Sequence, residues 1–426
     1  MVNRGKQVGM PVLPSFKMQD VALLKAERCG RLKWDHGMEV LIGGKGKASM
    51  GYDYALPEVR AYKLALIREV LEEYRPDGIE LDFVFTNTGF FKEGMEDKNI
   101  RIMNAFVAEI RKTAEEVGKA QGRQFKIMAR THHAREANFE HSIDIETWLR
   151  EKSIDYIVGE IEGVCMEPYT PGLEWISRAA NDAGGAAYIR PPRRVYDERT
   201  NYPAIEMVHA LSQTLRYQGF AGMYLGYLPW PLADEEYRVL REAAYPEIFA
   251  RRDNIYFLAP REGEMGKPST TPYRKLPQTL DEGETFSAEI FIADDVGKAK
   301  EDEEMREPVL TLRFESFCIE DDFTVRVNGM DLPRKQAEIT HYRGLKFKSY
   351  FPGPIQAPLG FEAHWLKYRL PVELVRQGKN SVEVTITKKS KIATFRRGIN
   401  GVEIPMFYRD FERPLGLGVE RIQAQG

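Results

Sequence analysis

Short apolar runs alternate with longer amphipathic segments over roughly the first 250 residues of the chain. The short runs have the length of β-strands and lie at 9–16, 79–85, 125–131, 155–161, 186–192 and 220–228. The longer segments repeat apolar residues at helical spacing and lie at 57–74, 98–118, 143–152, 171–183, 203–217 and 233–249. An alternation of this kind, with a repeat of about 30 residues, predicts parallel strands joined by right-handed crossovers.

The pattern changes after about residue 252. Segments such as "TFSAEIFIADD", "DFTVRVNGMDL" and "NSVEVTITKK" alternate apolar and polar residues and are separated by turn residues. Asn328-Gly329 is a hairpin signal, and the charged stretch 296–307 is expected to be a solvated loop. We therefore expect two domains, a βα domain over residues 1–251 and a jelly-roll-like antiparallel β-sandwich over residues 252–426.

Composition and charge narrow the class of protein. The 426 residues are 43% hydrophobic and 29% charged, with a net charge of −3, which gives no electrostatic reason to expect nucleic acid or an anionic membrane as a partner. The three cysteines, Cys29, Cys165 and Cys318, are too far apart for a disulfide framework or a zinc motif, and no cofactor is expected. No apolar run approaches membrane-spanning length. No signal peptide is recognisable, so the chain as it stands indicates a cytoplasmic protein, and a truncated N-terminus would leave the location open.

Polar and aromatic residues gather where the strands of the first domain are predicted to end. Across the six strands they are Lys17, then Asp82 and Asn87, then Arg130, His132 and His133, then Glu160 and Glu162, then Tyr188 and Arg190, and last Tyr224, Tyr227 and Trp230. TIM-type (β/α) barrels carry their active sites at the carboxyl ends of the strands. The pattern therefore predicts a barrel with one lined pocket.

Residues 8–20, 54–83 and 364–384 together resemble a bacterial glycoside hydrolase-like (β/α)8-barrel family with a C-terminal β-sandwich. "YALPEVRAYKLALIREVLEEYRPDGIELDF" (54–83) is similar to the helix and fourth strand of that family, including its Asp-Gly-Ile-Glu-Leu-Asp-Phe motif. "VGMPVLPSFKMQD" (8–20) resembles its third strand, and "HWLKYRLPVELVRQGKNSVEV" (364–384) resembles part of its sandwich. The resemblance implies this fold and a hydrolase of polysaccharides or oligosaccharides.

The chain departs from that family in two respects. The resemblance begins at the third strand of the family, so the first two βα units are absent from the pattern and an open barrel is expected. The strands at 9–16 and 220–228 would then be apolar edges with a gap between them. Such edges favour association of two copies of the chain through the gap. At the position where the family often has Arg, this chain has Phe85.

Asp82 is the first candidate for a catalytic carboxylate. Residues two apart on a strand point the same way, so Glu80 and Asp82 are expected to face the barrel interior, with Asp82 nearer the pocket. Asp82 would act as nucleophile or electrostatic stabiliser. The structural alternative is an Asp bonded to a neighbouring Arg or to loop amides, and Glu80 fits such a structural role better.

Hydrolysis of a glycosidic bond needs a second carboxyl group. Glu160 and Glu162, at the end of the fourth strand, are the candidates for a general acid/base, with a salt bridge at the pocket rim as the structural alternative. Glu167 lies further into the loop and is less favoured.

The remaining polar residues are expected to bind substrate. The predicted set is Lys17, Glu80, Asn87, Arg130, His132, Tyr188, Arg190, Tyr224 and Trp230. Arg190, with Arg193 and Arg194, would bind an acidic group on a glycan or pair with surface acids. The adjacent residues His132 and His133 point in different directions on a strand, so no metal site is expected. The glycine-rich segment 43–51 is a lid candidate.

Two other functions stay open. Phe85 and the absent βα units favour a non-catalytic carbohydrate-binding protein or a degenerate barrel. A carbohydrate isomerase or epimerase would usually need a convergent metal site.

Overall fold

The computed structural model describes most of the chain and divides it into two compact units. The described residues are 1–19, 40–43, 51–85, 89–92, 96–163, 165–192, 194–195, 203–226, 234–242, 245, 250–261, 271–346, 359–392 and 394–408. The first unit comprises residues 1–162, 172–190 and 218–224, and the second comprises 163–171, 191–217 and 225–426.

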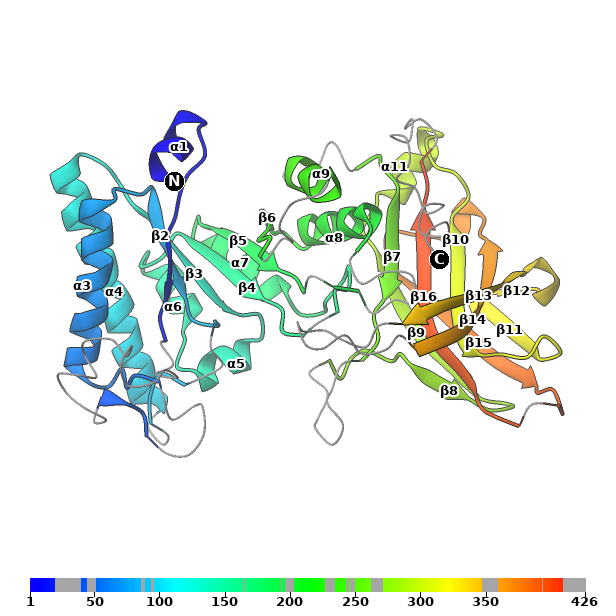
Figure 1. Ribbon diagram of the computed structural model, residues 1–426. Coiled ribbons are helices and arrows are strands. Elements are labelled where there is room, and N and C mark those ends of the chain that lie inside the picture. The colour runs from blue at the N-terminus through cyan, green and yellow to red at the C-terminus, as the bar shows by residue number, and fades with distance from the viewer. Residues whose placement is uncertain are drawn as a thin grey trace. The chain divides into compact units, whose positions relative to one another are not determined.

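The first unit is built on a six-stranded parallel sheet whose strands lie in chain order (Figure 1). The strands are β1 (Ser15–Lys17), β2 (Gly78–Asp82), β3 (Lys126–His132), β4 (Tyr156–Glu160), β5 (Ala186–Arg190) and β6 (Gly222–Met223). Among the described residues β1 and β6 are the edges, and no ladder joins them, so a closed barrel is not seen there.

Helices connect these strands and pack on one face of the sheet. They are α3 (Pro57–Glu73), α4 (Glu96–Gln121), α5 (Arg135–Glu140), α6 (Ile145–Arg150) and α7 (Glu174–Asp182), and a short α1 (Val2–Gln7) precedes β1. Pro57 occupies the first turn of α3, and Val59, Ile67 and Leu71 form its buried face. Gly159 marks the close packing of β4 on this layer, because a Cβ there would lie 2.7 Å from the side chain of Ile176 in α7.

The predicted strands and helices of this unit are present, with two differences at the edges. The strand expected at 9–16 is regular only over β1, because Pro11 and Pro14 have no N–H to donate to a ladder. The strand expected at 220–228 is confined to β6 within the described residues. Between β1 and α3, Leu41 forms a single antiparallel bridge to Tyr52.

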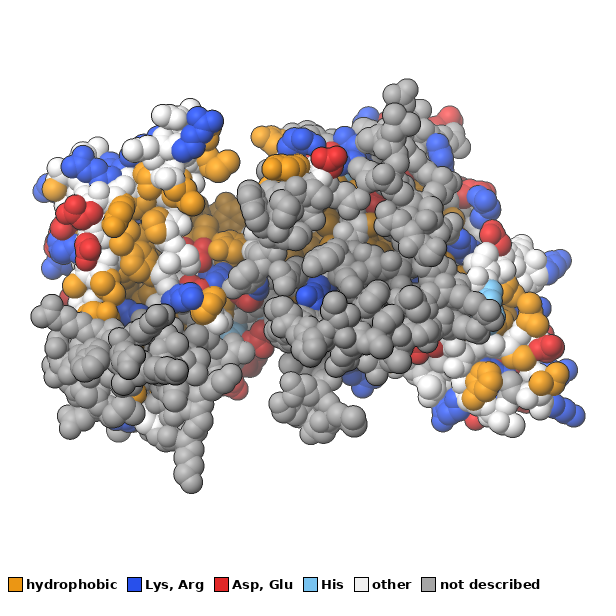
Figure 2. Space-filling model, viewed as in Figure 1, with side chains coloured by type: hydrophobic (Ala, Val, Ile, Leu, Met, Phe, Trp, Pro, Cys, Tyr) orange, Lys and Arg blue, Asp and Glu red, His pale blue; other side chains and the backbone are white. Residues whose placement is uncertain are grey.

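Apolar side chains reach the surface of the first unit near its β1 edge. In Figure 2 hydrophobic side chains gather beside α3 and β1. Val8, Met10 and Tyr74 are each more than half exposed. An apolar surface next to an edge strand agrees with the edge expected from the sequence, while association through it stays a prediction.

The second unit contains two antiparallel sheets. One has the order β13-β14-β10-β16-β7, with β8 paired to β16, and the other has the order β12-β11-β15-β9. The bounds of these strands are β7 (Asn254–Leu258), β8 (Gln278–Leu280), β9 (Thr285–Ile292), β10 (Val309–Ser316), β11 (Asp322–Val327), β12 (Met330–Leu332), β13 (Glu338–Lys346), β14 (Leu359–Arg369), β15 (Gly378–Lys388) and β16 (Arg397–Met406). Alternate residues such as Phe286, Val325 and Val384 form the buried core.

The unit also has short helical elements, one of which corrects a prediction. They are α8 (Ile205–Tyr217), α9 (Asp234–Glu242), α11 (Val296–Glu301), η4 (Arg334–Gln336) and η5 (Val372–Leu374). The charged stretch 296–307 begins with the helix α11, so the expectation of a loop there was wrong: the Asp295 side chain caps α11 and Val296 is buried. The hairpin signal is confirmed, since Asn328 and Gly329 have φ of 48° and 85° between β11 and β12.

A buried carboxyl group in this unit predicts a pH-dependent stability. Asp294 is 0% exposed and accepts hydrogen bonds from Tyr256 (2.7 Å), Asn254 (2.8 Å) and Tyr408 (2.9 Å). Burial raises the pKa of Asp294 from 3.8 to about 6. Folding therefore favours the protonated form of Asp294. The contribution of this group to the free energy of unfolding is complete below about pH 4, and roughly 3 kcal/mol of it is lost as the pH rises through about 6.

Asp294→Asn is expected to remove this part of the pH dependence, because the amide keeps the shape without titrating. Urea unfolding between pH 4 and 7 measures it. Asp322→Asn, at a carboxyl group that is 57% exposed, is the control and should leave the slope unchanged. Equal slopes for wild type and Asp294→Asn would contradict the assignment.

Within the described residues, none of the helices combines the length and the apolar character needed to cross a membrane.

Candidate functional site

The strand register of the first unit places a row of polar side chains on one face of the sheet. Lys17 is paired with Asp82, Asp82 with Arg130, His132 with Glu160, and Glu160 with Arg190. Paired residues of parallel strands point to the same side, opposite to the residues that pack on the helices. The alternation in the sequence thus identified a continuous face at the carboxyl ends of the strands.

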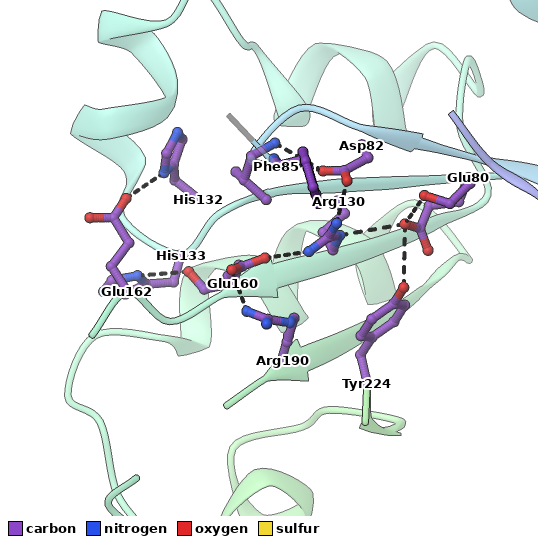
Figure 3. A network of polar contacts seen from close by, with 12 residues as sticks. Glu80, Asp82, Phe85, Arg130, His132, His133, Glu160, Glu162, Arg190 and Tyr224 are labelled. Carbon is purple, nitrogen blue, oxygen red and sulfur yellow. Dashed lines mark hydrogen bonds and ion pairs between the residues drawn. The ribbon is translucent and has the colours of Figure 1, made fainter. Parts of the chain in front are cut away.

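Arg130 lies at the centre of this face (Figure 3). Its Nη1 donates to Glu160 Oε2 at 2.6 Å, and its Nη2 donates to Asp82. Its Nε lies 3.4 Å from Glu80 Oε1. One guanidinium group, with a side chain only 7% exposed, therefore contacts the carboxylates of three residues from two other strands.

The contacts of Asp82 and Glu80 explain why charged residues occupy a buried strand. Oδ1 of Asp82 accepts the backbone N–H groups of Val84 (3.1 Å) and Phe85 (3.0 Å), while Oδ2 accepts from Arg130. A neighbouring Arg and loop amides are the partners expected if Asp82 has a structural role. Oε1 of Glu80 accepts from Ser15 Oγ at 2.8 Å and from the Tyr224 hydroxyl at 3.4 Å. Both carboxylates are thus hydrogen-bonded, as buried charges must be.

Glu160 is the most accessible carboxylate of the network. It accepts from Arg130 through Oε2 and from Arg190 through Oε1, and its side chain is 19% exposed, against 2% for Asp82. Burial raises the pKa of Glu160 above its ordinary value in spite of both arginines. Three carboxylates face two guanidinium groups here, so one negative charge is in excess when all are ionised. The excess negative charge favours binding of one proton by the three carboxylates. Glu160, the most exposed of them, is the group that can exchange this proton with solvent.

Tyr224 extends the network from the strand end at β6. Burial, followed by the nearby charge of Glu80, raises the pKa of Tyr224 to about 12. Its hydroxyl therefore stays protonated near neutral pH and can donate to Glu80. The Arg130 guanidinium lies 5.7 Å from the ring centroid of Tyr224, within cation–π range.

His132 and Glu162 form a separate pair. Nδ1 of His132 lies 2.6 Å from Glu162 Oε1, and this hydrogen bond lowers the pKa of Glu162. His133 instead contacts the backbone carbonyl of Glu160 at 3.1 Å, and burial lowers the pKa of its imidazole. The lowered pKa makes Glu162 a weaker candidate for a general acid than Glu160. In the described part of the chain no three His, Cys, Asp or Glu side chains converge as metal ligands would.

The other predicted residues fall outside this network. The Lys17 ammonium lies 3.3 Å from the ring centroid of Phe85, a cation–π contact at the position where the resembled family often has Arg. Tyr188 packs edge-to-face on Tyr156 at 6.4 Å. Asn87, Tyr227, Trp230, Arg193 and most of the lid candidate lie outside the described residues. Ser15 was missed, although its spacing of two from Lys17 marks it as a neighbour on the same face.

Comparison with known proteins finds resemblance only among solved structures. No protein-family model matches the chain, and no curated protein sequence does. The endo-beta-1,4-mannanase from Thermotoga petrophila has 10% identity and a TM-score of 0.42, over 87% of this chain and 81% of that one. The alpha-amylase from Geobacillus thermoleovorans has 11% identity and a TM-score of 0.31, over 86% and 79%.

A third structure is longer than this chain. The match to the cycloisomaltooligosaccharide glucanotransferase from Paenibacillus has 9% identity and a TM-score of 0.34, and covers 94% of this chain but 46% of that one. With TM-scores below 0.5, these likenesses carry no information on mechanism, and the function has to be inferred from the side chains.

Proposed function

We propose that the protein is a glycoside hydrolase acting on a polysaccharide or oligosaccharide through Glu160 and Asp82. The observation that supports this proposal is the bridging of both carboxylates by Arg130, at the ends of the strands β2 and β4 on either side of β3. Residues 1–251 and 252–426 would be its two domains. The remaining polar residues of the face, including Lys17 and Arg190, would bind sugar hydroxyl or acidic groups.

In this mechanism Glu160 is the general acid/base. Its raised pKa suits a group that gives a proton to the leaving-group oxygen. Asp82, held by two amides and a guanidinium, suits a charged nucleophile or stabiliser. The separation of the two carboxyl groups during turnover decides between retention and inversion of the anomeric configuration.

A non-catalytic carbohydrate-binding protein is the second candidate. It is favoured by the burial of Asp82, whose side chain is 2% exposed and whose two oxygens both accept hydrogen bonds. A nucleophile in that state has to release Arg130 before it reaches a sugar. In a binding protein the same network would only shape the surface that meets the glycan.

Glu160→Gln and Asp82→Asn are expected to lower kcat by about 10²- to 10⁴-fold, because each removes one role in proton transfer or charge stabilisation. Release of reducing ends from a panel of glycans measures this. The pH profile gives a second readout: wild-type activity should fall as the pH rises through the raised pKa of Glu160, and Glu160→Gln should lose that limb.

Glu146→Gln is the matched control, since the Glu146 carboxylate is 40% exposed and pairs with Arg135 away from the network. Its activity should equal that of wild type. Binding of glycans without turnover by the wild-type protein would favour the second candidate and reject the hydrolase.

A further inference from the structure

The second unit contains a cavity of about 300 Å³ that the proposed mechanism does not use. The cavity is lined by residues from 167–171, the end of β7, 273–275, and the strands β9 and β15. They include Glu167, Tyr169, Tyr273, Phe291 and Lys379. This volume is at the lower end of the range for small-molecule sites, which suits one or two rings rather than a long chain.

A buried ion pair fixes the base of the cavity. Arg274 Nε donates to Glu167 Oε2 at 3.0 Å, and Glu167 Oε1 accepts the backbone N–H of Ala259 at 3.0 Å. Arg274 also donates to the carbonyls of Cys165 (2.9 Å) and Pro260 (3.2 Å). Both charged groups are almost fully buried and hydrogen-bonded, so the cavity keeps its shape without a ligand.

Aromatic rings form the walls. Tyr169 and Phe291 stack with centroids 4.4 Å apart and planes 12° apart, and both are partly exposed. Tyr273 is 39% exposed, and the Arg274 guanidinium lies 5.7 Å from its ring centroid. Partly exposed rings that line a cavity offer an apolar surface that the C–H face of a ligand can cover.

The charges around the cavity limit the kind of ligand. Two acids, Glu167 and Glu289, line it together with three bases, Arg274, Lys275 and Lys379. Each acid has a basic partner, Arg274 for Glu167 and Lys379 for Glu289 at 2.8 Å. The net charge of the lining is therefore only +1, which suits a neutral or singly acidic ligand better than a phosphate group.

We propose that this cavity is a second glycan-binding site, which stacks a pyranose ring on Tyr273. The apolar C–H face of the sugar covers the ring, and its hydroxyl groups bond to the polar rim formed by Glu289, Lys379 and Lys275. The proposal rests on the proposed function in one respect, namely that the ligand of this protein is a glycan.

Calorimetric titration of Glu160→Gln, which binds without turnover, tests the site with neutral and uronic-acid oligosaccharides. In that background Tyr273→Ala is expected to weaken one class of sites at least about tenfold, so that the stoichiometry falls from two to one per chain. Tyr237→Ala is the control, because Tyr237 is 48% exposed and does not line the cavity. A thermal midpoint equal to that of wild type establishes that each variant is folded.

The outcomes separate this inference from the hydrolase proposal. Binding that depends on Tyr273 in a protein without any hydrolytic activity would support the second site and reject the hydrolase. Binding unchanged by Tyr273→Ala, or no binding by either variant, would overturn the second site whatever the activity. A preference for uronic acids that Lys275→Gln removes would support the site and assign the acidic group to Lys275.

Discussion

Arg130→Met is expected to lower the free energy of unfolding by about 3–5 kcal/mol and to remove activity. The guanidinium compensates charge on Asp82, Glu160 and Glu80, and methionine fills the volume without providing a donor. Removing one partner of a buried ion pair leaves uncompensated charge, which is the costly case. The loss of activity should be at least as large as that of Glu160→Gln, since both carboxylates lose their common partner.

Chemical denaturation at several pH values tests this expectation. The carboxylates left behind are neutralised at low pH, so the deficit of Arg130→Met relative to wild type should shrink as the pH falls. Arg68→Met is the matched control, because Arg68 is 41% exposed and pairs with Glu72 and Glu116 on the surface, where about 0–1 kcal/mol is expected. A deficit that is small, or the same at every pH, would be inconsistent with a central role for Arg130.

Arg397→Met is expected to destabilise the second unit by about 3–5 kcal/mol. Arg397 and Asp321 are both 0% exposed, and two nitrogens of the guanidinium donate to the two oxygens of the carboxylate. Asp321 also accepts the backbone N–H groups of Ser390 (2.7 Å) and Cys318 (3.0 Å). The pair thus joins residues 318–321 to residues 390–397, and removing Arg397 leaves a buried carboxylate without its cation.

Urea unfolding followed by circular dichroism measures this loss. The comparison variant is Arg326→Met, whose pair with Asp331 is 49% and 67% exposed and should contribute less than about 1 kcal/mol. Asp321→Asn together with Arg397→Met should recover part of the stability, because the double variant leaves no charge behind. Equal effects of the buried and the exposed arginine would contradict this ranking.

Much of the first unit could be predicted because its signals are local. A strand buried on both faces must pair any charge that it carries, so Glu80 and Asp82 already indicated a polar face, and the alternation extended it to Arg130 and Glu160. The choice of partners could not be predicted, because it depends on register between strands far apart in sequence. The short α5 was missed because its buried residue is the polar Asn138, so no apolar stripe marks the helix. The helix α11 was missed because its charged residues conceal two buried apolar positions, Val296 and Ala299.

The base of the aromatic cavity has a consequence for the order in which the chain folds. Glu167 and Arg274 are 107 residues apart, and the Cys165 carbonyl that Arg274 also binds is 109 residues away. At about 5–20 residues per second, Arg274 is synthesised roughly 5 to 20 s after Glu167. Over that interval the nascent second unit holds an acidic group without its cation, and contacts of such long range form late in folding. The base of the cavity is therefore expected to be completed only after Arg274 has been synthesised.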